Sequence, residues 1–161
     1  DLVFGLTLDV LRNISTLNAI VRQGGTKDGL VGPELEGKRF GVVGAGAIGS
    51  RVMRIAQAFG CEVVCYSRTK KDIPGVEFIE LDELLKTSDV VSLHIPQTPE
   101  TTGLIDAEKI ALMRPTAVLI VLVALLSIPR PLRLLSMRVV LLVLASMFWR
   151  WSLRSLLITR F

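Results

Sequence analysis

The last third of this 161-residue chain lacks the residue types that soluble α/β domains use at turns and helix ends. Residues 117–161 contain no Gly, Asp, Glu, Lys, Asn or Gln, and 13 of these 45 positions are Leu. Turns draw on glycine and asparagine, and helix starts draw on acids, so this composition is atypical of such a domain. We therefore expect this segment to behave differently from the chain before it.

Negative charge is also missing from that segment. Residues 1–116 carry 13 Lys and Arg against 15 Asp and Glu, a net charge of −2, whereas residues 117–161 carry six Arg and no acid, a net charge of +6. The chain's overall charge of +4 therefore reflects one segment. Because no stacking pattern of aromatic residues interleaves with these arginines, we expect no nucleic-acid partner.

Long hydrophobic runs are absent too. The two apolar runs of the segment, residues 117–128 and 139–149, have 12 and 11 residues, whereas a membrane-spanning helix needs about 20. Proline and arginine residues separate the runs. A membrane-associated protein is thus a weaker alternative, and we expect no membrane partner.

Cysteine and histidine are scarce. Cys61 and Cys65 flank a predicted strand and lie about 13 Å apart at the rise of a strand, which is too far for a disulfide. We expect buried free thiols in a reducing compartment, and hence a cytoplasmic protein. His94 is the only histidine and has no close Asp or Glu, so we expect it to pack or to line a cofactor cleft. We assign no catalytic residue and no metal ligand.

A glycine-rich turn is the most informative stretch of the chain. Residues 40–43 are predicted to form a strand, Gly44, Gly46 and Gly49 follow at once, and residues 50–59 show the periodicity of a helix. In this spacing the first glycine permits the tight turn, the second leaves room for a pyrophosphate, and the third lets the helix pack closely. The helix N-terminus then offers N–H groups to the phosphates. The pattern predicts a dinucleotide site.

The choice between NAD and NADP stays open. In dinucleotide-binding folds an Asp that binds the ribose hydroxyls often follows the second strand, which is predicted here at residues 62–66. In this chain Ser67 and Arg68 stand at that position. Arg68 could pair with a 2′-phosphate, stack on adenine, or remain a solvated cation. The expected cofactor-binding residues are Gly44, Ala45, Gly46, Ala47, Ile48, Gly49, Ser67, Arg68, His94, Pro96 and Thr101.

The remaining elements alternate in type. Further strands are predicted at residues 76–79, 90–93 and 117–120, and helices at residues 81–86 and 107–113, after one amphipathic helix over residues 2–23. Alternation of this kind predicts a Rossmann-type, doubly wound parallel sheet. The expected domains are a linking helix at 1–25, an NAD(P)-binding domain at 26–120, and an irregular apolar tail at 121–161. We expect the sheet to be incomplete, because the tail does not join it.

The chain contains the stretches LEGKRFGVVGAGAIG at residues 35–49, LDELL at 81–85 and SDVVSLHIPQTPETTGLI at 88–105. Together with the helix over residues 2–23 before them, these stretches resemble the D-isomer-specific 2-hydroxyacid dehydrogenases, the family of D-3-phosphoglycerate dehydrogenase. In that family the helix links the substrate domain to the nucleotide domain. The resemblance implies an oxidoreductase that passes hydride between NAD or NADP and a small D-2-hydroxy or 2-oxo acid, such as 3-phosphoglycerate or hydroxypyruvate. It also implies a homodimer, and a substrate domain that would precede Asp1.

The resemblance stops near residue 118. The family would continue with N-x-A-R-G, G-x-D-V and E-P. Our hypothesis is that a reading-frame slip accounts for the absence of these motifs. Read in the alternative frame, residues 137–160 are compatible with NEGRIAGAGIDVLEMEPPLPADHP, which has the expected motifs. In the family's pattern the catalytic Arg and Glu fall where Val123 and Ser152 stand, and the His falls beyond Phe161. The chain as it stands is therefore expected to be inactive. A dinucleotide-binding module without catalysis is the alternative.

Overall fold

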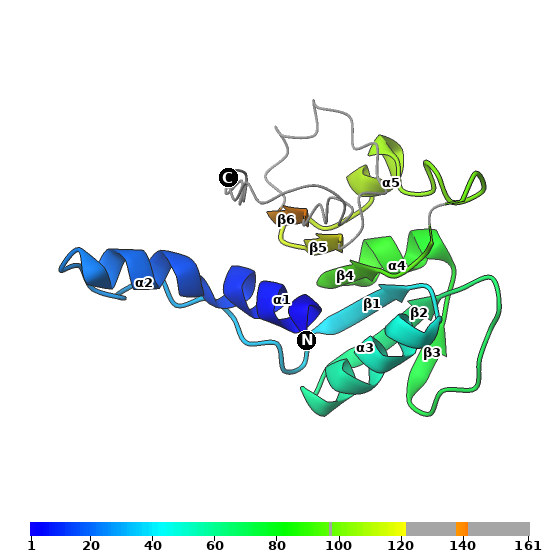
Figure 1. The fold of residues 1–161 in the computed structure, drawn as a ribbon, viewed down its shortest axis with the longest axis horizontal. Coiled ribbons are helices and arrows are strands. Elements are labelled where there is room, and N and C mark those ends of the chain that lie inside the picture. The colour runs from blue at the N-terminus through cyan, green and yellow to red at the C-terminus, as the bar shows by residue number, and fades with distance from the viewer. Residues whose placement is uncertain (97, 122–137, 142–161) are drawn as a thin grey trace, which may run out of the picture.

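The computed structural model describes residues 1–96, 98–121 and 138–141 (Figure 1). The helices are α1 (Leu2–Arg12), α2 (Ile14–Arg22), α3 (Ala47–Ala58), α4 (Leu81–Thr87) and α5 (Ala107–Ala111). The strands are β1 (Arg39–Val43), β2 (Glu62–Tyr66), β3 (Val76–Phe78), β4 (Val90–Leu93), β5 (Val118–Val121) and β6 (Arg138–Leu141).

The strands form one parallel sheet in the order β3-β2-β1-β4-β5-β6. In the register of β1 with β4, Gly41 lies opposite Val91 and Val43 opposite Leu93. The chain winds outward in one direction from β1 to β3 and in the other from β4 to β6. The predicted doubly wound parallel fold is confirmed, and its topological switch point lies between β1 and β4.

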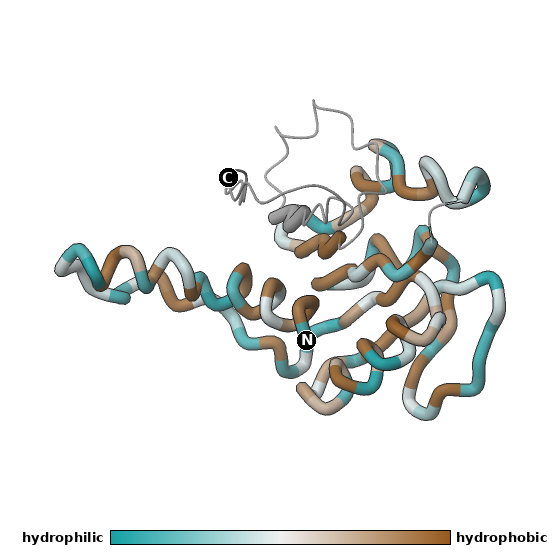
Figure 2. The backbone as a smooth tube through the Cα atoms, viewed as in Figure 1, coloured by the Kyte–Doolittle hydropathy of each residue, from teal (hydrophilic) through white to brown (hydrophobic). Residues whose placement is uncertain are grey.

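Helices cover both faces of this sheet (Figure 1). On one face, Phe40 and Val42 of β1 pack with the buried residues of α1 and α3. On the other face, Val43 packs with the buried residues of α4 and α5. Successive strand residues point to opposite faces, so each central strand contributes to both cores. The buried positions of β1, β2 and β4 are apolar apart from Gly41 and Ser92, and Figure 2 shows hydrophobic residues along these strands.

The first helix differs from the prediction. The single helix expected over residues 2–23 is wrong, because the chain breaks at Asn13 into α1 and α2. Asn13 has φ 54° and ψ 34°, a left-handed conformation that asparagine tolerates better than most residues. Its side-chain amide donates a 2.8 Å hydrogen bond to the Leu30 carbonyl, and the Ser15 amide donates to the Asp9 carboxylate at 2.6 Å. These polar contacts hold the break although the apolar stripe continues through it.

The two helices have different surroundings. The Phe4 ring of α1 stacks on the Phe40 ring at 5.7 Å and on the Phe59 ring at 5.4 Å, measured between centroids. Among the described residues of α2, by contrast, none is buried. Figure 1 shows α2 extending away from the sheet as an arm. The first half of the predicted helix is therefore part of the domain core, and the second half is exposed.

Most other element bounds agree with the prediction to within a few residues. The strands at 62–66 and 90–93 are confirmed as predicted, and α3 begins three residues earlier than expected, directly after the glycine turn.

Cys61 and Cys65 are confirmed as buried free thiols. Burial raises the pKa of each thiol to about 11, so both stay protonated at neutral pH. Among the described residues, no helix has the length and apolar character to cross a bilayer.

The expectation that nothing after residue 121 joins the sheet is wrong for one segment. Strand β6 pairs with β5 in parallel, with Val118 opposite Arg138 and Val121 opposite Leu141. The edge of β5 presents unpaired backbone groups, which any segment in extended conformation satisfies whatever its side chains. The other expectations for the tail concern residues 122–137 and 142–161, which lie outside the described residues.

Candidate functional site

Gly44 makes the turn that leaves β1. Its φ of 105° lies in the region that favours glycine. Its amide donates to the Tyr66 carbonyl at 2.8 Å, and a Cβ at this position would lie 2.6 Å from the His94 carbonyl oxygen. The end of β1 is thus held between the ends of β2 and β4. No larger residue fits this position without moving β4.

Gly49 fixes the approach of α3 to the same turn. A Cβ here would lie 1.9 Å from the carbonyl oxygen of Gly44, well inside van der Waals contact. The first turn of the helix therefore rests on the backbone of the loop. This contact places the N-terminus of α3 directly above the carboxyl end of β1.

Gly46 has no comparable constraint within the protein. Its φ of −67° and ψ of −173° are open to any L-residue, and a Cβ would meet no heavy atom within 4 Å. Gly46 is exposed, as are Ala47 and Ile48 after it, whereas Ala45 is buried. Since nothing in the described chain requires glycine here, the space beside Gly46 is the part of the turn that is free for a ligand.

The N-terminus of α3 faces that space. The Ser50 amide donates to the Gly46 carbonyl at 2.9 Å, which closes the first turn, and the amides before Ser50 have no partner within the helix. No acidic residue lies in this turn. The site therefore combines unpaired amide donors with the positive end of a helix dipole, which suits a phosphate.

Ser67 and Arg68 follow β2 at the same edge of the sheet. Ser67 is half-buried and Arg68 is exposed. Arg68 forms none of the ion pairs found across residues 1–96 and 98–121. Its guanidinium is therefore available for an anion brought by a ligand.

His94 and the loop after β4 complete this edge. The Nε2 atom of His94 lies 2.9 Å from the Oγ atom of the buried Ser92. Burial lowers the pKa of His94 to about 4, so the imidazole is neutral at pH 7. Further along, the Thr101 hydroxyl donates to the Pro96 carbonyl at 2.6 Å, which closes the loop on itself.

The structure brings the predicted residues to one edge, at the carboxyl ends of β1, β2 and β4. Their contacts with a cofactor stay a prediction. Sequence reasoning missed the partnership of Ser92 with His94, although residues two apart on a strand share a face, which is the signal that could have found it. Among the described residues no group of His, Cys, Asp or Glu is placed to hold a metal ion.

Comparison with known proteins gives consistent results. Residues 4–122 match the family described as D-isomer specific 2-hydroxyacid dehydrogenase, NAD binding domain. A glyoxylate reductase of Thermococcus litoralis is 40% identical over 132 residues, and a hydroxypyruvate reductase of Thermotoga maritima is 38% identical over 123 residues. Each match covers 74% of this chain and 40% of the relative, so the chain spans about two fifths of these proteins.

Solved structures agree. The D-lactate dehydrogenase of Aquifex aeolicus, complexed with NAD and lactic acid, is 36% identical and superposes with a TM-score of 0.69. The match covers 73% of this chain and 37% of that one. The similarity therefore extends from sequence to fold over the glycine turn and the sheet.

Proposed function

Because this chain belongs to the D-isomer-specific 2-hydroxyacid dehydrogenase family, through its NAD-binding domain, we propose that it serves an enzyme that reduces a small 2-oxo acid to a D-2-hydroxy acid. Glyoxylate, hydroxypyruvate and the 3-phosphoglycerate pair are the candidate substrates. They are supported by the names of the relatives, which are glyoxylate reductases, a hydroxypyruvate reductase and D-3-phosphoglycerate dehydrogenases. The substrate assignment is a proposal for the whole protein, of which this chain spans a part.

One observation carries the cofactor part of this proposal. Gly46 is open on its outer side and unconstrained by the fold, although it stands in the middle of two tightly constrained glycines. The pyrophosphate would pass over Gly46 and accept hydrogen bonds from the amides of Ala45, Ala47 and Ile48. Ser67 and Arg68 would lie at the adenosine ribose, and His94, Pro96 and Thr101 would line the cleft beyond. The bound dinucleotide supplies the hydride, and the chain's own residues bind and orient it.

We do not place the reacting groups of catalysis in this chain. The substrate carboxylate needs a cation such as an arginine, and the transferred proton needs a general acid–base with a carboxylate to orient it. By resemblance the arginine and the orienting carboxylate fall at Val123 and Ser152, neither of which can act in that role. Cofactor binding without turnover is the activity we expect of the chain.

Isothermal titration calorimetry with NADH and with NADPH tests this function directly. We expect the 161-residue chain to bind at least one dinucleotide and to show no oxidation of it with hydroxypyruvate. The absence of binding to both dinucleotides by folded protein would refute the cofactor site. Turnover above the rate without enzyme would refute the assignment of the chain as catalytically incomplete.

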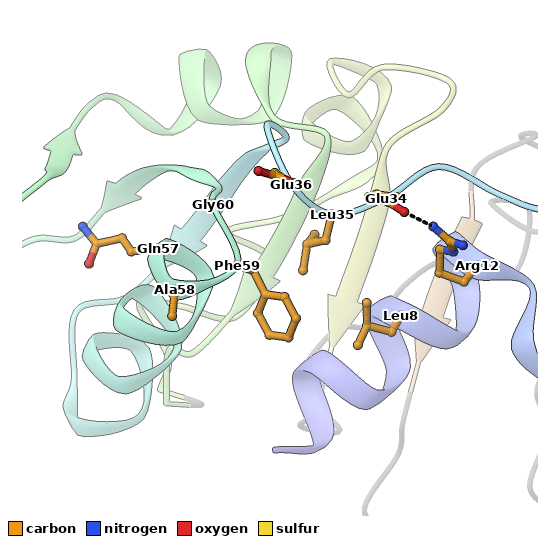
Figure 3. A pocket seen from close by; sticks show the side chains of 9 residues that line it. All are labelled: Leu8, Arg12, Glu34, Leu35, Glu36, Gln57, Ala58, Phe59 and Gly60. Atoms are coloured by element: carbon orange, nitrogen blue, oxygen red, sulfur yellow. Dashed lines mark hydrogen bonds and ion pairs between the residues drawn. The ribbon is translucent and has the colours of Figure 1, made fainter.

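We also propose that the chain forms a homodimer through the arm at α2. Val21 of α2 is exposed by 56%, although a helix in water gains little from presenting such a residue. Val31, in the loop after α2, is exposed by 54%. Beside the base of the arm lies an open pocket of about 650 Å³ (Figure 3). Its lining combines apolar residues, Leu8, Leu35 and Phe59, with polar ones, Arg12, Glu34, Glu36 and Gln57. Since the arm and the pocket occupy neighbouring parts of one chain, a two-fold pairing lets each arm cover the other's pocket.

Sedimentation velocity tests this pairing. Val21→Glu places a charge on the apolar part of the arm and is expected to produce monomers, whereas Lys27→Glu, a change of an already charged residue in the loop after α2, is expected to leave the dimer intact. A monomeric parent chain would refute the proposal.

Two buried free thiols support a reducing, cytoplasmic location, which we propose for the protein.

A further inference from the structure

We propose that Ser92 of β4 is a positioning residue that fixes His94 in its neutral Nδ1–H tautomer. The ring then presents one N–H donor to an acceptor oxygen of the dinucleotide at the carboxyl edge of the sheet. This role rests on the proposed cofactor function and deepens it, because it assigns a donor of the site and the residue that orients the donor.

The hydroxyl of Ser92 lies in an apolar part of the sheet. Ser92 is fully buried, and its neighbours in register are Val42 of β1 and Ile120 of β5. Both neighbours belong to the core that α1 and α3 cover, and neither side chain has a hydrogen-bond acceptor. The Nε2 atom of His94, which lies 2.9 Å from the Ser92 Oγ atom, is therefore the partner of this hydroxyl among the described residues.

This environment decides which atom of the pair donates the hydrogen bond. A neutral imidazole has one N–H donor and one acceptor nitrogen. If Nε2 of His94 carried the proton, it would donate to Oγ of Ser92 and leave the buried hydroxyl hydrogen without an acceptor, which destabilises the folded state. If Oγ donates to Nε2, both groups are satisfied and the ring proton lies on Nδ1. The second arrangement is therefore favoured.

The Nδ1–H group is the open donor of the pair. Within residues 1–96 and 98–121, Nδ1 of His94 has no hydrogen-bond partner, and it is not among the buried side-chain atoms that lack one. His94 is half-buried, so part of its ring reaches solvent. Burial lowers the pKa of His94 to about 4, so the ring carries a single proton at neutral pH. The ring thus offers one uncharged donor.

The ring lies on the side of the sheet that faces α3. Ser92 and Val42 share that face, and a residue two positions along the strand returns to it. His94 follows β4 at its carboxyl end, where its amide donates to the Val43 carbonyl at 2.8 Å and its carbonyl lies beside Gly44. Helix α3 begins at the same edge, directly after the turn at Gly44. The ring and the open amides of α3 therefore share one face at the switch point between β1 and β4, where ligands bind in such sheets.

Nuclear magnetic resonance reads this tautomer directly, because His94 is the only histidine of the chain. In the 161-residue protein labelled with ¹⁵N-histidine, we expect Nδ1 to be protonated and Nε2 to be unprotonated at neutral pH. We also expect the Nδ1 resonance to move when NADH or NADPH is added. A purely structural role of the Ser92 hydroxyl would not produce this second change.

Substitution of Ser92 links the tautomer to binding. Ser92→Ala should remove the preference for Nδ1–H and raise the dissociation constant of the dinucleotide by about two- to tenfold, which corresponds to one uncharged hydrogen bond. Ser88→Ala is the matched control. Ser88 is equally buried, but its hydroxyl has no partner in the part of the chain that the structure describes. This variant should leave the tautomer and the affinity unchanged.

Two substitutions of His94 test the donor itself. The side-chain nitrogen of asparagine can occupy the position of Nδ1, whereas that of glutamine reaches the position of Nε2. His94→Asn should therefore retain more affinity for NADH or NADPH than His94→Gln does. Equal affinities of the two folded variants would overturn the role of Nδ1–H as the donor.

The remaining outcomes separate this role from the cofactor site. A parent ring protonated on Nε2 would overturn the role of Ser92, whether or not a dinucleotide binds. An Nδ1 resonance that bound dinucleotide leaves unchanged, or equal effects of Ser88→Ala and Ser92→Ala on affinity, would overturn the donor role and leave the site intact. Failure of the folded parent chain to bind NADH and NADPH would overturn the site, and the donor role with it. The Nδ1–H tautomer together with a loss of affinity in Ser92→Ala alone supports the inference.

Discussion

Replacing Gly46 with alanine should separate cofactor binding from stability. The backbone angles of Gly46 suit an L-residue, and the added Cβ meets no atom within 4 Å. Alanine has fewer conformations than glycine in the unfolded chain, and this difference stabilises the folded state by about 0.4–1 kcal/mol. The loss of glycine as helix N-cap costs a similar few tenths to about 1 kcal/mol. The two effects offset each other, so we expect the free energy of unfolding to change by less than about 0.5 kcal/mol.

Binding should respond quite differently to the same change. The methyl group of Gly46→Ala occupies the open space beside the first turn of α3, where the pyrophosphate must approach the amides. A displaced phosphate loses charge-assisted hydrogen bonds, each worth about 1.5–3 kcal/mol. We therefore expect the dissociation constant for NADH to rise by at least about tenfold, since 1.4 kcal/mol corresponds to that factor.

Gly49→Ala is the matched comparison. Its Cβ would lie 1.9 Å from the Gly44 carbonyl oxygen, so the turn and the helix must move apart. Overpacking of this kind costs about 1–3 kcal/mol, and this variant should lose stability and binding together. Urea unfolding followed by circular dichroism measures the first quantity, and calorimetry with NADH measures the second. Unchanged NADH affinity in a folded Gly46→Ala variant would refute the route of the pyrophosphate over Gly46.

Three further predictions concern other parts of the molecule. Phe4→Ala should lower the free energy of unfolding by about 3–5 kcal/mol. Phe59→Ala should lower it by less, because Phe59 is 39% exposed and Phe4 is 6% exposed. Equal losses of stability in urea unfolding would contradict the packing of α1. In the folded chain the pKa of His94 is lowered to about 4 from an ordinary value near 6.5. The neutral imidazole therefore contributes fully to stability above pH 6.5, and roughly 1–3 kcal/mol of stability is lost as the pH falls toward 4. A His94→Gln variant whose unfolding shows the same pH dependence between pH 6.5 and 4 would rule out this cause. Sequencing of the coding DNA should give a G-x-D-V motif in the alternative frame over the codons of residues 137–160, and its absence would end the reading-frame hypothesis.

The glycine turn and the inner strands could be predicted because their signals are local. The strand before Gly44 is apolar and short, and the spacing to Gly46 and Gly49 has few other uses. The residues of β4 are buried at every position and apolar apart from Ser92, which is typical of a strand buried on both faces. These features depend on neighbours within a few residues, so a single sequence is sufficient to locate them.

The break at Asn13 and the pairing of β6 could not be predicted, because distant parts of the chain decide them. The left-handed conformation of Asn13 depends on the Leu30 carbonyl, which arrives from seventeen residues later. Strand β6 forms along an edge of β5 that any extended segment can satisfy, so its side chains give no signal.

The packing of α1 sets an order of events during synthesis of the chain. Helix α1 covers the sheet over β5, whose first residue is Val118, more than a hundred residues after α1. At a ribosomal rate of about 5–20 residues per second, this strand follows the helix by roughly 6–23 seconds. Through that interval the apolar side of α1 with Phe4 has no strand β5 to cover. Until the fifth strand leaves the ribosome, the emerging chain can bury Phe4 only against Phe40 and Phe59, which are made earlier.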